Sequence, residues 1–195
     1  MSEIKKIKNF NSRYSLQSVK MENSFNNSFN NVHLENIDLE DIEEKRYEID
    51  QNGNVTLLEV NTDLAEKMDL LVDKCKEAGL NVKITESIRS VTRQDELYAQ
   101  GRTKGEKIVT NAKGSDYSSM HQWGIAFDVC INDVNDAYNI EKLKQVGEIG
   151  KSIGLEWGGD WEKFPDMPHF QLVGYSIEEL KDIYGNPGEF SETWN

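Results

Sequence analysis

Two histidines in this chain stand near acidic side chains, in a pattern suited to metal-ion chemistry. His121 precedes Asp128 in one segment, and His169 follows Asp166 by three positions in another. Two imidazoles and one carboxylate form the three-ligand set of catalytic zinc sites, because such a set leaves one position open for water. The same ligand types bind non-haem iron, so residue types alone leave Fe(II) as an alternative. The third histidine, His33, lies in a different segment that is rich in asparagine.

Asp128 lies in a segment whose pattern predicts a half-buried strand. Apolar residues at positions 125, 127, 129 and 131 alternate with Ala126, Asp128 and Cys130, so the aspartate shares a face with small side chains. Burial of a carboxylate there costs several kcal/mol unless a cation or hydrogen-bond donors compensate. A metal ion is the simplest compensation, and pairing of Asp128 with an arginine is the alternative without a metal.

The elements that position these side chains follow from the spacing of apolar residues. Recurrence at helical spacing predicts helices at 63–78, 92–100, 140–153 and 176–184, and alternation predicts strands at 80–84, 125–131 and 169–173. Thr62 is expected to cap the first helix and Gly79 to end it, and residues 185–187 are expected to break the last one. Because helices flank a few strands without regular alternation, the pattern predicts an α+β domain with a small, mainly antiparallel sheet.

The first 54 residues differ from the rest of the chain. Asparagine and serine crowd this segment, its front is basic and its rear acidic, and it has few apolar side chains for a core of its own. We expect residues 1–54 to be an N-terminal arm, either a linker or a segment that docks onto a partner. Residues 55–195 are expected to form the folded domain that carries the chemistry.

The overall composition argues against several classes of protein. With 22 basic and 35 acidic side chains, the net charge of -13 repels phosphate backbones and disfavours nucleic-acid binding. No apolar run approaches the roughly 20 residues that a membrane helix needs, and the lysines of residues 1–10 are not followed by the apolar region of a signal peptide. Cys75 and Cys130 are expected to be buried free thiols, because neither belongs to a CxxC pair.

Several motifs of the chain resemble those of a known peptidase family. They are ESIRS at 86–90 followed by Gln94, SMHQWGIAFD at 119–128, GLEWGGDW at 154–161 and DMPHFQ at 166–171. In this order and separation they resemble the phage-endolysin-type L-alanyl-D-glutamate peptidases, relatives of the zinc D-alanyl-D-alanine carboxypeptidases and the vancomycin-resistance dipeptidases. The resemblance covers roughly residues 60–175 and implies a D-Ala-D-Ala-peptidase/Hedgehog-like fold.

The resemblance also implies roles for individual residues. They are one zinc ion held by His121, Asp128 and His169, Asp166 as general base, Arg89 as the cation that polarises the scissile carbonyl, and Gln94 and Ser119 at the substrate-binding cleft. For Arg89, the alternative is a surface salt bridge. Trp123, Trp157 and Trp161 either line the cleft or complete the core.

The activity implied by the resemblance is hydrolysis of the stem peptide of bacterial peptidoglycan, at the bond between L-alanine and D-glutamate. The protein would then be a phage or prophage endolysin, or a tail-associated lysin whose residues 1–54 dock onto a phage or tail protein. It would be made in the cytoplasm and act at the cell wall after release or as part of a particle. Two alternatives remain: a D-alanyl-D-alanine carboxypeptidase, and a metal-binding structural module without catalysis.

Overall fold

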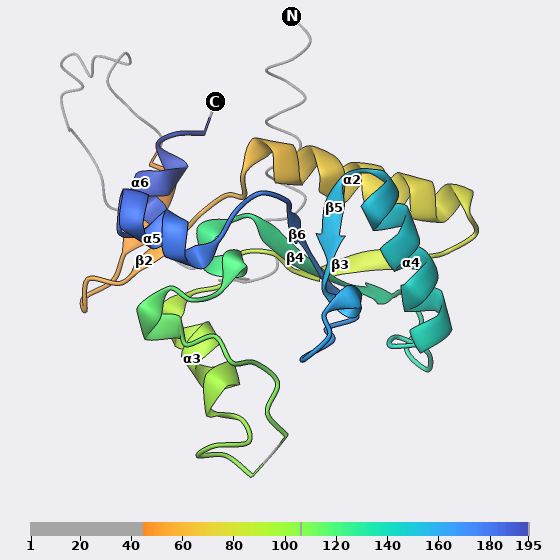
Figure 1. The fold of residues 1–195 in the computed structure, drawn as a ribbon, viewed down its shortest axis with the longest axis horizontal. Helices are drawn as coiled ribbons and strands as arrows, with labels where there is room; N and C mark the ends of the chain where they lie inside the picture. The colour runs from red at the N-terminus through yellow and green to blue at the C-terminus, as the bar shows by residue number, and fades with distance from the viewer. Residues whose placement is uncertain (1–44, 106, 195) are drawn as a thin grey trace, which may run out of the picture. The chain divides into compact units, whose positions relative to one another are not determined.

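The computed structural model describes residues 45–105 and 107–194, and the described residues from Arg46 onward form one compact unit (Figure 1). Most of the predicted N-terminal arm, residues 1–44, lies outside the described residues. The strands are β1 (Tyr47–Ile49), β2 (Val55–Leu57), β3 (Val82–Glu86), β4 (Ala126–Ile131), β5 (Leu155–Trp157) and β6 (His169–Leu172). The α-helices are α2 (Thr62–Glu77), α3 (Val91–Ala99), α4 (Ile140–Ser152), α5 (Ile177–Tyr184) and α6 (Pro187–Ser191), and the short 3₁₀ helices are η1 (Gly114–Asp116), η2 (Met120–Trp123) and η3 (Gly158–Asp160).

A four-stranded sheet lies at the centre of this unit. Its strand order is β3-β4-β6-β5, and every neighbouring pair is antiparallel. β1 and β2 form a separate antiparallel hairpin. In the view of Figure 1, α2 lies above the central sheet and α3 below it. The predicted α+β class, with a small antiparallel sheet flanked by helices, is confirmed.

Helices α2 and α4 cover one face of the sheet and bury the core against it. On this face Phe127 of β4 stacks on Phe170 of β6, with ring centroids 5.6 Å apart. Two glycines of α4 allow the close approach: an added Cβ at Gly147 would lie 2.4 Å from the Trp157 ring, and one at Gly150 would lie 2.3 Å from the Phe170 ring. Because side chains alternate along a strand, the neighbours of Phe127 and Phe170 point to the opposite face.

The pairing of β3 with β4 contains an irregularity that matters for that opposite face. Ile84 pairs with Val129, but Glu86 pairs with Asp128, so the register shifts by one residue between Ile84 and Glu86. Without the shift, Glu86 would lie opposite Phe127 and would share its face. A bulge of this kind re-aims a side chain, and here it brings Glu86 to the side of the sheet that carries Asp128.

The helix boundaries follow the predicted ones closely, with one corrected cap. The N-cap of α2 is Asn61, whose side chain accepts a hydrogen bond from the Asp63 backbone N–H at 3.0 Å. Thr62 is therefore the first helical residue, and the prediction that it caps the helix was wrong by one position. Gly79 follows the helix end with φ of 78°, a left-handed conformation that favours glycine.

Two kinds of element were absent from the prediction: the strands and α-helix β1, β2, β5 and α6, and the three short 3₁₀ helices. Strand β5 has three residues, too few for an alternating pattern to be recognised, and it lies between the helix predicted at 140–153 and the strand predicted at 169–173. Helix α6 begins at Pro187, where the sequence predicted a break. Proline is well suited to the first turn of a helix, and the Asn186 side chain caps that turn by accepting from the Gly188 N–H at 2.9 Å.

The hairpin of β1 and β2 joins residues on both sides of the predicted boundary at residue 54. Arg46, just before β1, donates from Nη1 to the backbone oxygens of Ser191 at 2.9 Å and Trp194 at 2.7 Å. Residues 46–54, predicted as the end of the arm, thus make hydrogen bonds within the compact unit.

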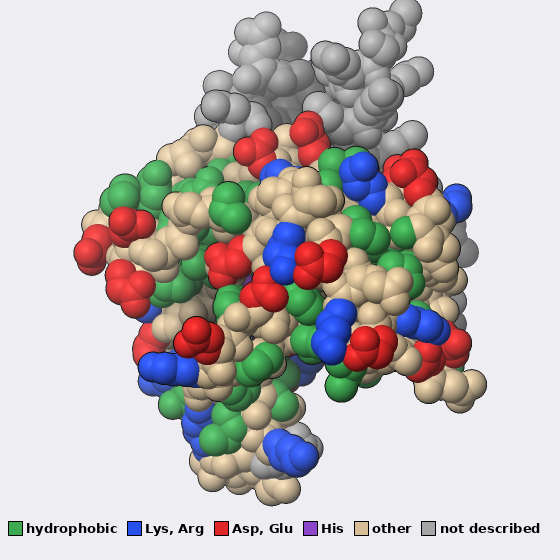
Figure 2. Space-filling view, turned by 45° about the vertical axis from the view of Figure 1, so that its right-hand side comes forward, with side chains coloured by type: hydrophobic (Ala, Val, Ile, Leu, Met, Phe, Trp, Pro, Cys, Tyr) green, Lys and Arg blue, Asp and Glu red, His purple; other side chains and the backbone are tan. Residues whose placement is uncertain are grey.

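Two expectations from the composition concern the state of the cysteines and the absence of a membrane-spanning helix. Cys75 and Cys130 are both free and buried, which confirms that prediction. In the described part of the chain, no helix combines the length and apolar character needed to cross a membrane. On the face shown in Figure 2, acidic and basic side chains are interspersed.

Candidate metal centre and cleft

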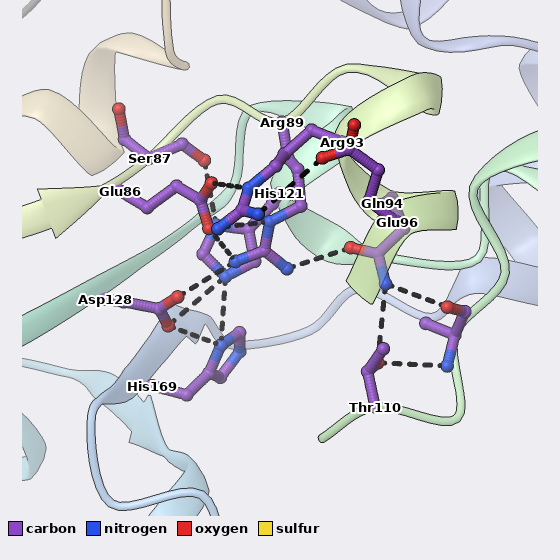
Figure 3. A network of polar contacts seen from close by, with 11 residues as sticks. Glu86, Ser87, Arg89, Arg93, Gln94, Glu96, Thr110, His121, Asp128 and His169 are labelled. Atoms are coloured by element: carbon purple, nitrogen blue, oxygen red, sulfur yellow. Dashed lines mark hydrogen bonds and ion pairs between the residues drawn. The ribbon is translucent and has the colours of Figure 1, made fainter. Parts of the chain in front are cut away.

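Three of the predicted site residues meet on the sheet face opposite α2 and α4. Asp128 of β4 and His169 of β6 lie directly opposite each other in the strand register, and His121 comes from η2. One ligand atom from each residue lies within 4.8 Å of the others (Figure 3). His121 Nε2 is 3.2 Å from His169 Nδ1, and each of these nitrogens is 3.3 Å from Asp128 Oδ1.

The segment that carries His121 is held by its own hydrogen bonds. The Gln122 side chain donates to the Gly114 backbone oxygen at 2.9 Å, and Trp123 Nε1 donates to the Tyr117 backbone oxygen at 2.8 Å. Gly124 ends η2 in a left-handed conformation with φ of 67°, which favours glycine. These contacts fix the direction in which His121 points toward the sheet.

In each of the two histidines, one ring nitrogen faces Asp128 and the other faces away from it. The hydrogen-bond partner of the nitrogen that faces away determines which of the two carries the proton. His121 Nδ1 lies 2.9 Å from the Ser87 backbone oxygen, and His169 Nε2 lies 3.0 Å from Gln171 Oε1. Both partners are acceptors, so each outward nitrogen carries the hydrogen in a neutral ring. The inward nitrogens and Asp128 Oδ1 then present three lone pairs to one point. This arrangement, with each histidine oriented by an acceptor behind it, fits a divalent metal ion.

The charges of these groups are coupled in the metal-free protein. Burial lowers the pKa of His121. Burial also lowers the pKa of His169, but the hydrogen bond to Asp128 and the charge of that carboxylate outweigh burial and raise it. Burial raises the pKa of Asp128, but the two histidines outweigh it and hold that pKa well below its usual range. Asp128 is therefore a carboxylate.

Arg89 lies beside Asp128 and is almost entirely buried, with a side-chain exposure of 8%. Its Nη2 donates to Asp128 Oδ2 at 2.9 Å, its Nε to Glu86 Oε2 at 2.8 Å and its Nη1 to Gln94 Oε1 at 2.8 Å. The alternative of a surface salt bridge is therefore wrong for Arg89. Asp128 thus pairs with an arginine, the alternative considered without a metal, through Oδ2, while its Oδ1 faces the two histidines.

A cleft with a volume of about 430 Å³ opens onto these groups. Asp166 and Ser119, two further predicted site residues, line it together with Arg89 and the three proposed ligands. Burial, and then the charge of Asp128, raise the pKa of Asp166. Gln94, predicted at the cleft, is fully buried and is not among the residues that line it. It contacts two residues that do, because it accepts from Arg89 and donates to the Ala112 backbone oxygen at 2.8 Å.

The three tryptophans divide between core and cleft. Trp123 and Trp157 are core residues, one of the two alternatives given by the sequence. Trp161 lines the cleft, where its ring lies 5.0 Å from the His169 ring and its Nε1 donates to Glu156 Oε1 at 2.8 Å. Sequence patterns could not distinguish these positions, because each of the three tryptophans stands within a family motif.

The acidic cleft residue Glu86 received no role from the sequence. Glu86 lines the cleft and pairs with Arg89 and Arg93. Its signal in the sequence was an acid three positions before an arginine at the end of a predicted strand. That signal was weak, because the bulge that turns Glu86 toward the cleft leaves no mark in the residue pattern.

Comparison with known proteins supports the resemblance seen in the motifs. A family model described as D-alanyl-D-alanine carboxypeptidase matches residues 112–172. The chain is 39% identical over 119 residues to the peptidoglycan L-alanyl-D-glutamate endopeptidase CwlK of Bacillus subtilis, covering 55% of this chain and 70% of that protein. It is 32% identical over 132 residues to the L-alanyl-D-glutamate peptidase of Listeria phage A118, covering 65% of this chain and 42% of that protein.

Among solved structures, the chain is similar to the Serratia marcescens L-Ala D-Glu endopeptidase ChiX. The TM-score is 0.44 at 25% identity, over 58% of this chain and 80% of that one. The family assignment rests instead on the sequence relatives, above all on the match that spans 70% of CwlK. The residues matched by the family model include Ser119, all three candidate ligands and Asp166. We conclude that the chain belongs to the D-alanyl-D-alanine carboxypeptidase-like family of metallopeptidases.

Proposed function

We propose that this protein is a zinc-dependent endopeptidase that hydrolyses the stem peptide of bacterial peptidoglycan between L-alanine and D-glutamate. The observation that carries the proposal is the convergence of His121 Nε2, Asp128 Oδ1 and His169 Nδ1 at the floor of a cleft. Two imidazoles and a carboxylate are one of the three-ligand sets found in catalytic zinc sites. The names of the B. subtilis and Listeria phage relatives support the choice of bond.

The proposed ligands for the zinc ion are His121, Asp128 and His169. When bound there, the ion would act as a Lewis acid that polarises a carbonyl oxygen and lowers the pKa of a water molecule. The ligand types also suit Fe(II), so zinc is preferred on the support of the family and not of the donor atoms alone. Ser87 and Gln171 would keep the two rings in the tautomers that expose a lone pair to the metal.

Asp166 is the proposed general base. It lines the same cleft as the three ligands, and burial raises its pKa above that of an ordinary aspartate. A carboxylate of raised pKa is a stronger base, so it accepts a proton from the attacking water more readily. The same carboxyl group then holds the proton that the leaving amine requires when the amide bond breaks.

Arg89 is proposed to stabilise the negative charge that develops on the carbonyl oxygen. Its contacts with Glu86, Gln94 and Asp128 leave one N–H of Nη1 without a partner among the described residues. A fixed donor of this kind stabilises a developing oxyanion without having to reorient during the reaction. Gln94 would act through Arg89 by fixing Nη1, and Ser119 would contact the substrate from the cleft wall.

Digestion of purified muropeptides tests this proposal directly. Cleavage between L-alanine and D-glutamate exposes a new D-glutamate amine, which amine labelling followed by mass spectrometry detects. The wild-type protein should produce it with zinc bound, and a chelator should abolish the product. A wild-type protein that folds and binds zinc but leaves every muropeptide intact would favour the alternative of a metal-binding structural module without catalysis.

The second candidate function is that of a D-alanyl-D-alanine carboxypeptidase. It is favoured by the description of the family model that matches residues 112–172. The chemistry and the site residues would be unchanged, and only the bond would differ. Release of free D-alanine from pentapeptide muropeptides, without a new D-glutamate amine, would establish this alternative in the same experiment.

We also propose that the protein acts at the cell wall, after release or as part of a particle, and that residues 1–54 dock onto a phage or tail protein. The composition of the segment supports docking. Because Arg46 and β1 bond within the compact unit, a deletion should stop at residue 44. If the deleted protein keeps its muropeptide activity but is no longer incorporated into particles, docking is supported; unchanged incorporation would count against it.

A further inference from the structure

Glu86 is a carboxylate at the end of β3 that joins two arginines (Figure 3). Its Oε2 accepts from Arg89 Nε at 2.8 Å and also from Nη2 of the same side chain, and its Oε1 accepts from Arg93 Nε at 3.2 Å. Arg89 donates onward to Asp128 Oδ2 at 2.9 Å. Positive and negative charges therefore alternate in a row that begins at the half-exposed Arg93 and ends at the metal centre.

The backbone brings Glu86 into this row by an irregular register. Glu86 pairs with Asp128 because of the shift after Ile84, and Asp128 pairs in turn with His169 on the next strand. The three side chains thus lie side by side across β3, β4 and β6. A regular β3 would have turned the Glu86 carboxylate toward the apolar face, where it would be desolvated without a partner.

We propose that Glu86 is a positioning residue of the metal centre. It holds the Arg89 guanidinium in the orientation that engages only Asp128 Oδ2, and so leaves Oδ1 directed at the two histidine nitrogens. This inference rests on the proposed function, because it takes the cluster of His121, Asp128 and His169 as the site of the metal.

Electrostatics gives the reason that a second carboxylate is needed. Arg89 is 8% exposed, so its charge is poorly screened at the distance of 2.9 Å from Asp128. Alone, that charge would repel a divalent cation and would draw both carboxylate oxygens of Asp128 into a bidentate pair. Glu86 offsets the charge and occupies Nε and one N–H of Nη2, so the Nε–Nη2 edge of the guanidinium is not available for a bidentate pair with Asp128.

Zinc affinity of the purified full-length protein tests the proposal, with a chromogenic chelator as competitor. Glu86→Gln keeps the size of the side chain and removes its charge. We expect zinc binding to weaken by about 10- to 100-fold, the usual effect of losing a residue that orients a ligand. A purely structural role of Glu86 would instead lower the melting temperature of the metal-free protein and leave the zinc affinity of the folded protein unchanged.

Glu96→Gln is the matched control. Glu96 also pairs with Arg93, at 3.9 Å, but it is exposed and stands outside the row that leads to Asp128. Its variant should bind zinc with the parental affinity. A second comparison is between the single variant Arg89→Gln and the double variant that also carries Glu86→Gln. Because Glu86 acts through Arg89, the zinc affinities of these two variants should differ by less than about twofold.

The outcomes separate this inference from the proposed function. A parent protein that binds no zinc overturns both. A parent that binds zinc, together with a Glu86→Gln variant of equal affinity, overturns the inference alone. If circular dichroism shows that Glu86→Gln does not fold, Glu86→Asp replaces it, since its shorter side chain cannot reach both arginines. Weaker zinc binding by that variant supports the inference, and parental affinity overturns it.

Discussion

The two faces of the central sheet are built from neighbouring residues but held together in different ways. Phe127 and Phe170 stack on the face beneath α2 and α4 and are fully buried. Asp128 and His169, the next residue in β4 and the preceding one in β6, point to the other face and enter a network of directed polar contacts. Strand alternation makes this division possible, because consecutive side chains take opposite faces.

This difference shows which face of the sheet determines the stability of the protein and which determines its chemistry. The apolar face depends on volume and close packing, so a change there should alter the free energy of unfolding and leave the reaction intact. The polar face depends on the direction of a few hydrogen bonds and charges, so a change there should alter metal binding or the rate. Substitutions on one face should therefore change the free energy of unfolding, and substitutions on the other should change metal binding or the rate.

Removal of the metal is expected to have the largest effect. The protein should lose all muropeptide-digesting activity when a chelator removes zinc from the polar face, and added Zn²⁺ should restore that activity. The metal-free protein should also melt at a lower temperature, because a ligand at a thousandfold excess over its Kd stabilises the folded state by about 4 kcal/mol. Muropeptide digestion and thermal denaturation of the same samples measure both effects. Full activity of a sample shown to be free of metal would refute the role of the cluster.

Replacement of the proposed base should have the next largest effect. Asp166→Asn keeps the shape of the side chain but cannot accept a proton, so the rate should fall by about 10²- to 10⁴-fold. Zinc affinity and melting temperature should stay near the parental values. Asp160→Asn is the control, because Asp160 is half-exposed and pairs with Lys151. Equal rates for the two variants would remove Asp166 from the proposed mechanism.

The sequence predicted the long elements and the convergence of the ligands because both leave a periodic or chemical signal. Helix α2 was placed to within one residue, since its buried side chains recur every third or fourth position. The short strand β5 and the proline-initiated helix α6 had no such signal. The role of Glu86 depends on a one-residue bulge, and the burial of Gln94 depends on contacts with Arg89 and Ala112 that no local pattern encodes.

A substitution on the apolar face should lower stability without changing the chemistry. Gly150→Ala places a Cβ 2.3 Å from the Phe170 ring, so α4 or the ring must move. Overpacking of this kind costs about 1–3 kcal/mol, which denaturant unfolding measures. The kinetic constants at a temperature where both proteins are folded should match those of the parent. Gly105→Ala is the control, because an added Cβ there meets nothing within 4 Å.

The smallest effect on activity is expected when the folded protein is treated with a thiol reagent that could modify Cys75. This cysteine lies in the apolar core on the buried side of α2. Burial raises the pKa of this thiol to about 11, from an ordinary value of 9.0. The thiolate is the reactive form, so at neutral pH the native protein should hold about a hundredfold less of it at this position than an exposed thiol would. Peptide mapping after brief treatment with iodoacetamide should find Cys75 unmodified in the folded protein and modified after denaturation, with activity unchanged before denaturation. Labelling of Cys75 in the native state would mean that α2 opens from the sheet, and the apolar face would then be less closed than its packing implies.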